Sequence, residues 1–352
     1  MSLATLLRTR IAQTGPISVA EYMAECLLNP DHGYYSTRDP LGAEGDFTTA
    51  PEISQMFGEL IGLALAQAWL DQGAPAPFTL AEIGPGRGTL MADILRATAA
   101  VPGFGAAAEV CLIEASPSLR QKQRDTLAGT PFRHLDDVTG LPDAPLFLVA
   151  NEFFDALPIR QFIRTAEGWR ERLVGLADEA LAFGFGQPDW PAELAPRTDV
   201  AEGQIVETCP AAAPIMAEIA ARIAARGGAA LVIDYGDWRS LGDTLQALRR
   251  HEPEDPLANP GAADLTAHVD FEALATAAPG LTASRLTPQG VFLERLGITP
   301  RAQALANRLS GAALDSHIAA HRRLTHPEEM GTLFKVLAFT AKGAPMLPGL
   351  EP

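Results

Sequence analysis

The hydrophobic positions along residues 78–150 predict strands that alternate with helices. Residues 78–83 form a short apolar run that ends in a glycine-rich loop, and residues 89–100 have the periodicity of a helix. Three further strands are predicted by apolar runs at 110–113, 132–135 and 146–150, of which the second is the weakest. Strands that alternate with helices usually pair in parallel, with right-handed crossovers. The pattern therefore predicts an α/β fold.

The pattern changes after residue 151. Short antiparallel strands joined by tight turns are predicted at 159–165, 168–176 and 180–185. A helix at 210–226 and a buried strand at 229–233 then resume the first pattern, and a closing strand is predicted at 334–340. Residues 1–77 and 300–324 have mainly helical character, 270–278 form a further helix, and 251–263 form a polar loop.

The net charge and the cysteine content exclude several kinds of partner and site. The formal net charge is −16, which would repel a phosphate backbone, so we expect no nucleic acid partner. Three widely separated cysteines provide neither a disulfide framework nor a metal site. No apolar run is long enough to cross a membrane, and residues 1–14 lack the apolar core of a signal peptide. We expect a cytoplasmic location or an organelle of similar redox state.

The loop after the first strand has the sequence Gly84-Pro85-Gly86-Arg87-Gly88. Alternating glycines let the backbone turn sharply and approach a nucleotide, although a structural turn or another nucleotide fold would also explain them. Glu114 ends the next strand, where a carboxylate can accept both hydroxyls of an adenosine ribose. Glu82 precedes the loop and favours a cationic ligand without phosphate, namely S-adenosylmethionine, over a dinucleotide. In the alternative, Glu82 only orders the loop backbone.

Two further polar groups follow strands of the predicted sheet. Asp136 and Asp137 follow the third strand, where Asp136 is predicted to bond the adenine amino group, unless the pair only forms a turn or cap. Asn151, Glu152 and Asp155 follow the fourth strand, at the edge where open α/β sheets bind ligands. We predict these three as catalytic residues, and Asn151 also as a cofactor ligand. The alternative is a helix start that Asp155 caps.

Methyl transfer is an in-line displacement, so the protein mainly aligns the acceptor and excludes water. If the acceptor is a guanidinium, whose pKa exceeds about 12, Glu152 and Asp155 can orient it and take the released proton. An amine or carboxylate acceptor would demand less of these residues.

Several longer motifs resemble the MidA family of class I methyltransferases, which includes a mitochondrial complex I assembly factor. The matching blocks run in the family's order from about residue 33 to residue 340, and they lie at 45–55, 82–90, 114–117, 151–160, 267–271, 289–293 and 330–336. The resemblance implies a Rossmann-like sheet of seven mostly parallel strands, with a helical N-terminal region and an inserted α+β substrate region. For mitochondrial members it implies methylation of an arginine in a complex I subunit.

The resemblance also gives the polar residues of the N-terminal block a role. Asp46 and Thr49 are predicted to contact the methionine end of the cofactor, and Glu52 and Gln55 the substrate. In the alternative, Thr49 and Glu52 form a capping box that opens a helix. His268 and Asp270 are predicted to line the acceptor channel, although a lone histidine there is more often a cap or packing residue.

We therefore divide the chain by function. The predicted parts are a helical region that covers the cofactor (1–77), the first part of the cofactor domain (78–158), inserted antiparallel strands (159–208), the resumed cofactor domain (209–236), a helical and loop substrate region (237–333), and a closing strand with a tail (334–352). The expected partner is a protein substrate, and no metal is expected. The chain looks like a bacterial cytoplasmic relative; a trimmed eukaryotic one would belong in the mitochondrial matrix.

Three other functions compete with this interpretation. A nicotinamide-dependent oxidoreductase would need a site such as Tyr-x-x-x-Lys, and none of the four tyrosines has a lysine four residues on. A non-catalytic assembly chaperone would not need the intact loop and Glu114. A small-molecule methyltransferase is the nearest alternative, because the residues alone do not identify the acceptor.

Overall fold

The computed structural model describes residues 1–37 and 49–352, which form two compact units. The first comprises the described part of 1–47 together with 155–213 and 237–270. The second comprises the described part of 48–154 together with 214–236 and 271–352. Each unit is thus assembled from three separate stretches of chain. None of the helices in the described ranges is long and apolar enough to cross a membrane.

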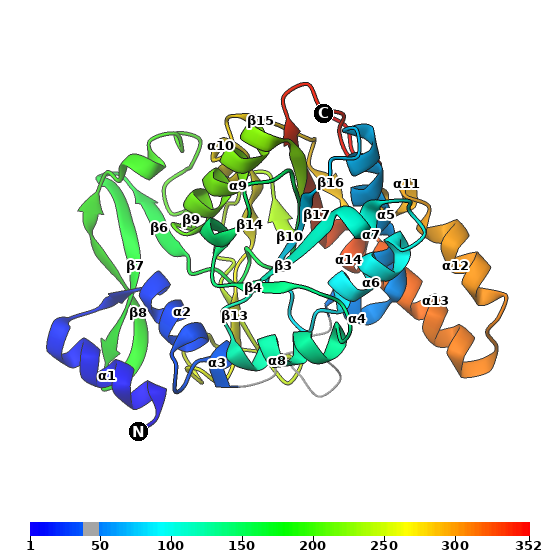
Figure 1. The fold of residues 1–352 in the computed structure, drawn as a ribbon. Helices are drawn as coiled ribbons and strands as arrows, with labels where there is room; N and C mark the ends of the chain where they lie inside the picture. Colours follow the sequence, from blue (N-terminus) through cyan, green and yellow to red (C-terminus); the bar gives the residue numbers. More distant parts are fainter. Residues whose placement is uncertain (38–48) are drawn as a thin grey trace. The chain divides into compact units, whose positions relative to one another are not determined.

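The second unit is built on a mixed sheet, shown in Figure 1. From edge to edge its strands follow the order β15-β17-β10-β5-β2-β3-β4, with β16 paired to β17 beside this path. The pairs from β10 to β4 are parallel, whereas β17 is antiparallel to both of its neighbours. The strands are β2 (Phe78–Ile83), β3 (Ala108–Ile113), β4 (Arg133–Leu135), β5 (Leu146–Asn151), β10 (Gly228–Asp237), β15 (Leu281–Ala283), β16 (Thr287–Pro288) and β17 (Phe334–Ala341). The predicted α/β class is confirmed.

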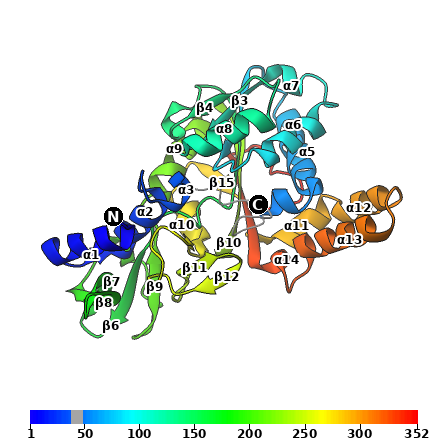
Figure 2. The ribbon, with the colours of Figure 1, turned by 90° about the horizontal axis from the view of Figure 1, so that it is seen from below.

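Helices lie on both faces of this sheet, with α5 and α11 on one side and α9 on the other (Figure 2). They are α4 (Ala50–Ile53), α5 (Gln55–Asp71), α6 (Thr89–Thr98), α7 (Phe104–Ala107), α8 (Pro117–Thr126), α9 (Ala212–Arg226), α10 (Phe271–Thr276), α11 (Gln289–Arg295), α12 (Ile298–Ala306), α13 (Gly311–Thr325) and α14 (Met330–Leu333), with a 3-10 turn η1 (Val138–Gly140). Because both faces are covered, β2 and β5 are buried along their whole length.

Helices α5 and α6 pack closely because glycines face the contact. A Cβ on Gly58 would lie 2.5 Å from Asp93 Cβ, and one on Gly62 would lie 2.9 Å from Ile94 Cα. Glu59, on the same helix, is 5% exposed and pairs with Arg96 of α6 at 2.8 Å. This packing fixes the helix that begins directly after the glycine loop.

The first unit contains two smaller sheets. The larger has the order β1-β7-β6-β9, with β8 paired to β7, and the smaller has the order β12-β11-β13. Its elements are α1 (Leu3–Thr14), β1 (Ile17–Ser18), α2 (Val19–Leu28), α3 (Tyr34–Thr37), β6 (Arg160–Thr165), β7 (Gly168–Ala177), β8 (Ala180–Asp189), η2 (Ala192–Leu194), β9 (Ile205–Thr208), β11 (Gln246–Arg249), β12 (Glu252–Glu254), β13 (Asp264–Thr266) and β14 (Val269–Asp270). The three antiparallel strands predicted after residue 159 are confirmed as β6, β7 and β8. The prediction of a loop over 251–263 is wrong at residues 252–254, which form β12 and pair with β11.

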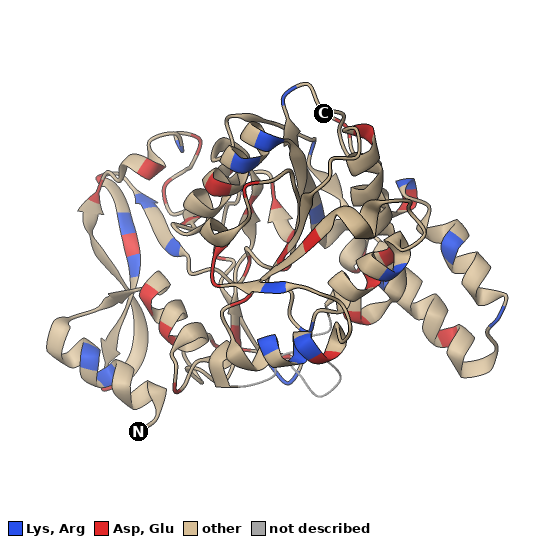
Figure 3. Ribbon diagram, in the orientation of Figure 1, with Lys and Arg blue, Asp and Glu red and all other residues tan. Residues whose placement is uncertain are grey.

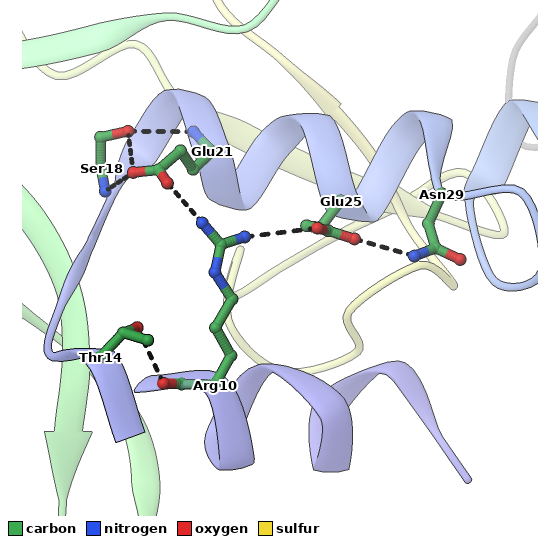
Figure 4. Close-up of polar contacts among 6 residues, drawn as sticks. All are labelled: Arg10, Thr14, Ser18, Glu21, Glu25 and Asn29. Atoms are coloured by element: carbon green, nitrogen blue, oxygen red, sulfur yellow. Dashed lines mark hydrogen bonds and ion pairs between the residues drawn. The ribbon is translucent and has the colours of Figure 1, made fainter. Parts of the chain in front are cut away.

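Helices α1 and α2 are joined by polar contacts around Arg10 (Figure 4). The Arg10 guanidinium donates to Glu21 at 2.5 Å and to Glu25 at 3.3 Å. Ser18 and Glu21 form a capping box at the start of α2, which satisfies backbone N–H groups there. Glu25 also accepts from Asn29 at 2.8 Å. These contacts fix the pairing of the two N-terminal helices.

Arginine side chains of the larger sheet stack on aromatic rings. Arg164 lies between the rings of Trp169 and Trp190, at 5.3 and 4.6 Å from their centroids. Arg172 lies 3.7 Å from the Phe183 ring centroid and pairs with Asp243. Figure 3 shows basic and acidic positions next to one another along β7. The basic residues of this sheet thus have local structural contacts.

Candidate active site

The glycine loop after β2 adopts left-handed backbone conformations. Gly84, Gly86 and Gly88 have φ values of 65°, 51° and 82°, where side chains with a Cβ are strained. The Gly84 N–H donates to the Ile113 carbonyl at 3.0 Å, which joins the loop to the end of β3. A Cβ on Gly84 would lie 2.9 Å from the Phe153 ring. The shape of the loop therefore requires glycine at these positions.

Glu82 is buried on β2, just before the loop, with 3% exposure. Burial raises the pKa of Glu82 to about 8, the Met91 backbone N–H lowers it, and the neighbouring charge of Glu114 raises it. Its Oε2 atom is buried and has no hydrogen-bond partner among the described residues. The contact with Met91, in the first turn of α6, supports a loop-ordering role for one oxygen. The other oxygen is suited to a cation.

Glu114 directly follows β3 and is 8% exposed. Its Oε1 accepts the Ser116 N–H at 2.8 Å, and its carbonyl accepts Arg120 Nε at 2.7 Å. Burial raises the pKa of Glu114, against the lowering effect of the hydrogen bonds that it accepts. Helix α8 has Ser116 as its N-cap and Pro117 as its first residue. Helix α8 thus begins right beside this carboxylate.

Asn151 and Glu152 lie where β5 ends. Glu152 has a φ of 52°, and its Oε1 accepts Asn151 Nδ2 and the Ala50 N–H, each at 3.1 Å. Asn151 is 7% exposed, and its Oδ1 has no hydrogen-bond partner among the described residues. No helix begins at 152–158, so the alternative in which Asp155 caps a helix is wrong. The chain continues as an irregular turn.

The sequence analysis did not single out Asp234, which lies on β10. It is fully buried, and its Oδ2 accepts the N–H groups of Phe153 and Phe154 at 3.2 and 3.0 Å. It therefore holds the turn that follows Asn151 and Glu152. The signal in the sequence was an aspartate directly after the apolar run 229–233, comparable to the glutamate that follows the apolar run 110–113.

The N-terminal block contacts the start of α6. Glu52 Oε1 accepts the Thr89 hydroxyl at 2.5 Å. Thr49 precedes α4 but makes no side-chain capping hydrogen bond, so the capping-box alternative is wrong. Gln55 is exposed at the first position of α5. Asp46 lies outside the described residues, so its predicted role stays a prediction.

Asp136 and Asp137 follow β4 and differ in their contacts. Asp137 caps η1 by accepting the Thr139 N–H at 2.8 Å, as the turn alternative expects. Asp136 pairs with Arg120 at 2.6 Å, and its side chain is 90% exposed. The predicted adenine contact of Asp136 stays a prediction.

Three predicted residues belong to the first unit. Asp155 is 6% exposed, and its carbonyl accepts the Ala267 N–H at 3.0 Å. The His268 N–H donates to the Thr244 hydroxyl at 2.8 Å. Asp270 accepts the Ser240 N–H at 3.2 Å. The structure thus places Asp155 and the segment containing His268 side by side within this unit.

The glycine loop, Glu114 and Asn151 lie at one edge of the sheet in the second unit. Because β2 pairs in parallel with both β3 and β5, the loop at Gly84, the carboxylate of Glu114 and the amide of Asn151 follow three adjacent strand ends. That edge is where open α/β sheets bind ligands. It offers left-handed glycines and buried carboxylate and amide oxygens, which fit a ligand that carries hydroxyls and positive charge.

Comparisons with known proteins agree with this geometry. The model of a family of S-adenosyl-L-methionine-dependent methyltransferases matches residues 60–289. The protein arginine methyltransferase NDUFAF7, mitochondrial, of Rattus norvegicus is 38% identical over 362 residues, which cover 94% of this chain and 82% of that protein. The Danio rerio protein of the same name is 40% identical over 359 residues and 94% of this chain, with 84% of its own length covered.

A solved structure is similar over the whole length. A crystal structure from Burkholderia thailandensis, bound to S-adenosyl-homocysteine, has a TM-score of 0.84 and 33% identity, and the match covers 99% of this chain and 93% of that one. A second crystal structure from the same organism has a TM-score of 0.83 at 34% identity, with the same coverage of both chains. The chain described here belongs to this family of S-adenosyl-L-methionine-dependent methyltransferases.

Proposed function

We propose that the protein transfers a methyl group from S-adenosylmethionine to a guanidinium nitrogen of an arginine side chain in another protein. The observation that carries this choice of acceptor is the similarity to relatives named as protein arginine methyltransferases, over 94% of this chain. We further propose a subunit of respiratory complex I as the client, as the resemblance to the MidA family implies. The proposed location is the bacterial cytoplasm, with the mitochondrial matrix as the alternative for a eukaryotic source.

The residues at the sheet edge fit the cofactor. Two buried oxygens, Glu82 Oε2 and Asn151 Oδ1, have no hydrogen-bond partner among the described residues and suit an ammonium or sulfonium group. In this proposal Glu114 accepts the ribose hydroxyls, and Gly84, Gly86 and Gly88 let the loop backbone approach the ligand because they carry no side chain. Pro85 is a further proposed contact of the loop. The bound cofactor supplies an electrophilic methyl group.

The chain itself has to orient the acceptor, exclude water and accept one proton. Asn151 and Glu152 stay the proposed catalytic residues of the second unit, and Asp155 is the proposed carboxylate of the first. Glu152 Oε1 accepts the Ala50 N–H of α4 and Asn151 Nδ2, and these two hydrogen bonds hold its side chain at the end of β5. The remaining proposed contacts come from Asp46, Thr49 and Asp136 toward the cofactor and from Glu52, Gln55, His268 and Asp270 toward the substrate.

We also propose that the sheet is a class I methyltransferase sheet of seven strands. The support is the seven-strand path β15-β17-β10-β5-β2-β3-β4, in which β17 is the antiparallel strand between β10 and β15. In this assignment β16 is an addition to the sheet.

Transfer of an isotope-labelled methyl group tests the proposed function. The purified protein is incubated with labelled S-adenosylmethionine and a complex I preparation, and the acid hydrolysate is analysed for methylarginine by mass spectrometry. We expect labelled methylarginine with the native protein and a loss of at least about tenfold with Glu114→Ala, which removes a charged hydrogen-bond acceptor.

The other outcomes point to the competing functions. Label in a small molecule but not in protein would replace the arginine proposal with a small-molecule methyltransferase. Client binding without cofactor binding, measured by calorimetry, would instead support the assembly chaperone.

A further inference from the structure

A fully buried glutamine joins two parts of the cofactor edge. Gln123 lies on α8 and has no solvent exposure. Its Nε2 donates to the Gly86 carbonyl at 2.7 Å and to Glu114 Oε2 at 3.2 Å. The two acceptors belong to different segments, the glycine loop after β2 and the residue after β3. A single side chain thus spans both.

The orientation of this amide follows from its partners. A carbonyl and a carboxylate only accept hydrogen bonds, so the nitrogen of Gln123 must face Gly86 and Glu114. Its Oε1 then faces His134 Nε2, on β4, at 2.8 Å. That contact requires His134 to carry a proton on Nε2, since an amide oxygen cannot donate. Both donors of the Gln123 amide are thereby used.

The carboxylate of Glu114 is held from two sides. Oε1 accepts the Ser116 N–H at 2.8 Å, and Oε2 accepts Gln123. A backbone hydrogen bond from Ala115 also lowers the pKa of Glu114, so the carboxylate is held by its own loop as well as by α8. Helix α8 also packs directly on the loop, because a Cβ on Gly88 would lie 3.4 Å from Gln123 Cγ.

We propose that Gln123 is a positioning residue that fixes the Glu114 carboxylate relative to the glycine loop, so that both meet the adenosine part of the cofactor in one geometry. The inference rests on the proposed role of Glu114 as the ribose ligand. Leucine at this position would leave the Gly86 carbonyl and one carboxylate oxygen without a donor in a buried site.

Gln123 also affects the protonation of Glu114. Burial raises the pKa of Glu114, while the hydrogen bonds from Ser116 and Gln123 and the nearby Arg120 lower it. Glu82 faces it from β2 with like charge. From β4, the pKa of His134 is lowered by burial, Arg120 and Arg124, which favours a neutral ring. Without Gln123, Glu114 becomes protonated at a higher pH, and a carboxylic acid offers fewer acceptor sites to a diol.

Calorimetric titration with S-adenosylmethionine, at about pH 6 and about pH 8, tests the proposal. We expect Gln123→Leu to weaken binding about tenfold at the higher pH and further at the lower pH. Gln123→Glu, which is close in shape, should show the opposite trend, because its carboxyl group regains a donor when protonated. Glu82 also titrates near this pH range, in the native protein and in the variants alike. The affinity of each variant is therefore expressed as a ratio to that of the native protein at the same pH.

Gln121→Leu is the matched control. Gln121 lies on the same helix, is exposed, and bonds Asp125 and Arg124, so we expect no change in affinity. If Gln123→Leu binds as the native protein does while Glu114→Ala binds weakly, the positioning role is wrong and the proposed site stands. If Glu114→Ala also binds normally, the proposed site itself fails. Equal weakening of Gln123→Leu and Gln123→Glu at both pH values would indicate a merely structural role.

Discussion

Two buried glutamates, one in each unit, have opposite hydrogen-bonding states. Glu82 on β2 and Glu207 on β9 are 3% and 4% exposed, and burial raises the pKa of both. Glu207 Oε1 accepts Gln161 Nε2 at 2.7 Å and the Thr244 N–H at 2.9 Å, and its Oε2 accepts the Thr244 hydroxyl. Glu82 Oε2 has no hydrogen-bond partner among the described residues.

The difference separates a structural carboxylate from a ligand-binding one. A buried carboxylate whose oxygens are satisfied by the chain contributes to folding and has little left to offer a ligand. A buried carboxylate with an open acceptor costs folding energy, which is typical of functional sites. Burial and a raised pKa alone therefore do not distinguish a ligand-binding carboxylate from a structural one. The distinction lies in whether each carboxylate oxygen has a hydrogen-bond donor within the protein.

The largest expected effect is on the structural member of the pair. Glu207→Ala removes the acceptor of Gln161 and of both Thr244 donors, which should lower the free energy of unfolding by about 3 kcal/mol. Urea unfolding, followed by circular dichroism, measures this loss. Affinity for S-adenosylmethionine in the folded protein should stay within about twofold. A large loss of affinity at unchanged stability would contradict the distinction drawn between the two glutamates.

The ligand-binding member should show the reverse pattern. Glu82→Gln keeps the shape but removes the negative charge, so binding of the cationic cofactor should weaken about thirtyfold. Stability at neutral pH should be unchanged or higher, because the native Glu82, whose pKa is raised to about 8, must take up a proton or lose its hydration on folding, whereas glutamine needs neither. Glu109→Gln is the control, since Glu109 lies on the adjacent β3 with a 44% exposed side chain that pairs with Arg133. Normal binding by Glu82→Gln would assign Glu82 to loop ordering alone.

Local patterns explain why much of the second unit could be predicted. The strand, glycine loop and helix from Phe78 to Thr98 are contiguous, so periodicity and turn chemistry suffice to find them. The same holds for α8, because its Ser116 cap and its first residue, Pro117, are adjacent in the chain.

The features that the sequence analysis missed depend on contacts between residues far apart in the chain. Asp234 bonds Phe153, 81 residues away in the chain, and Gln123 bonds Gly86, 37 residues away. The strand at 252–254 forms because β11 pairs with it, and its own polar sequence predicted a loop. Thr49 and Glu52 have capping-box spacing, but Glu52 bonds Thr89 of another helix instead. Spacing within one segment cannot reveal such competition.

The protonation of Glu82 gives a further test of the comparison between the two glutamates, with a smaller expected effect on affinity. Free Glu82 has a pKa of about 8, and a bound cation favours the ionised form, so its pKa falls on binding. Below about pH 8 binding then releases a proton, and affinity should rise about tenfold per pH unit before it levels off. Calorimetry in two buffers with different ionisation enthalpies measures the released proton. Glu82→Gln should abolish this release, whereas Glu207→Gln should retain it.

The smallest effect is expected at Asp136, a carboxylate that is neither buried nor satisfied by the backbone. Its side chain is 90% exposed and pairs with Arg120, so water competes for every contact that it makes. Asp136→Ala should therefore weaken cofactor binding only about threefold, even if the carboxylate bonds the adenine amino group. Asp137→Ala, which removes the cap of η1, should leave the affinity unchanged. Equal affinities for the two variants would remove Asp136 from the site. A loss of affinity beyond about thirtyfold would mean that cofactor binding buries the Asp136 carboxylate, which would then act as a buried ligand-binding carboxylate like Glu82.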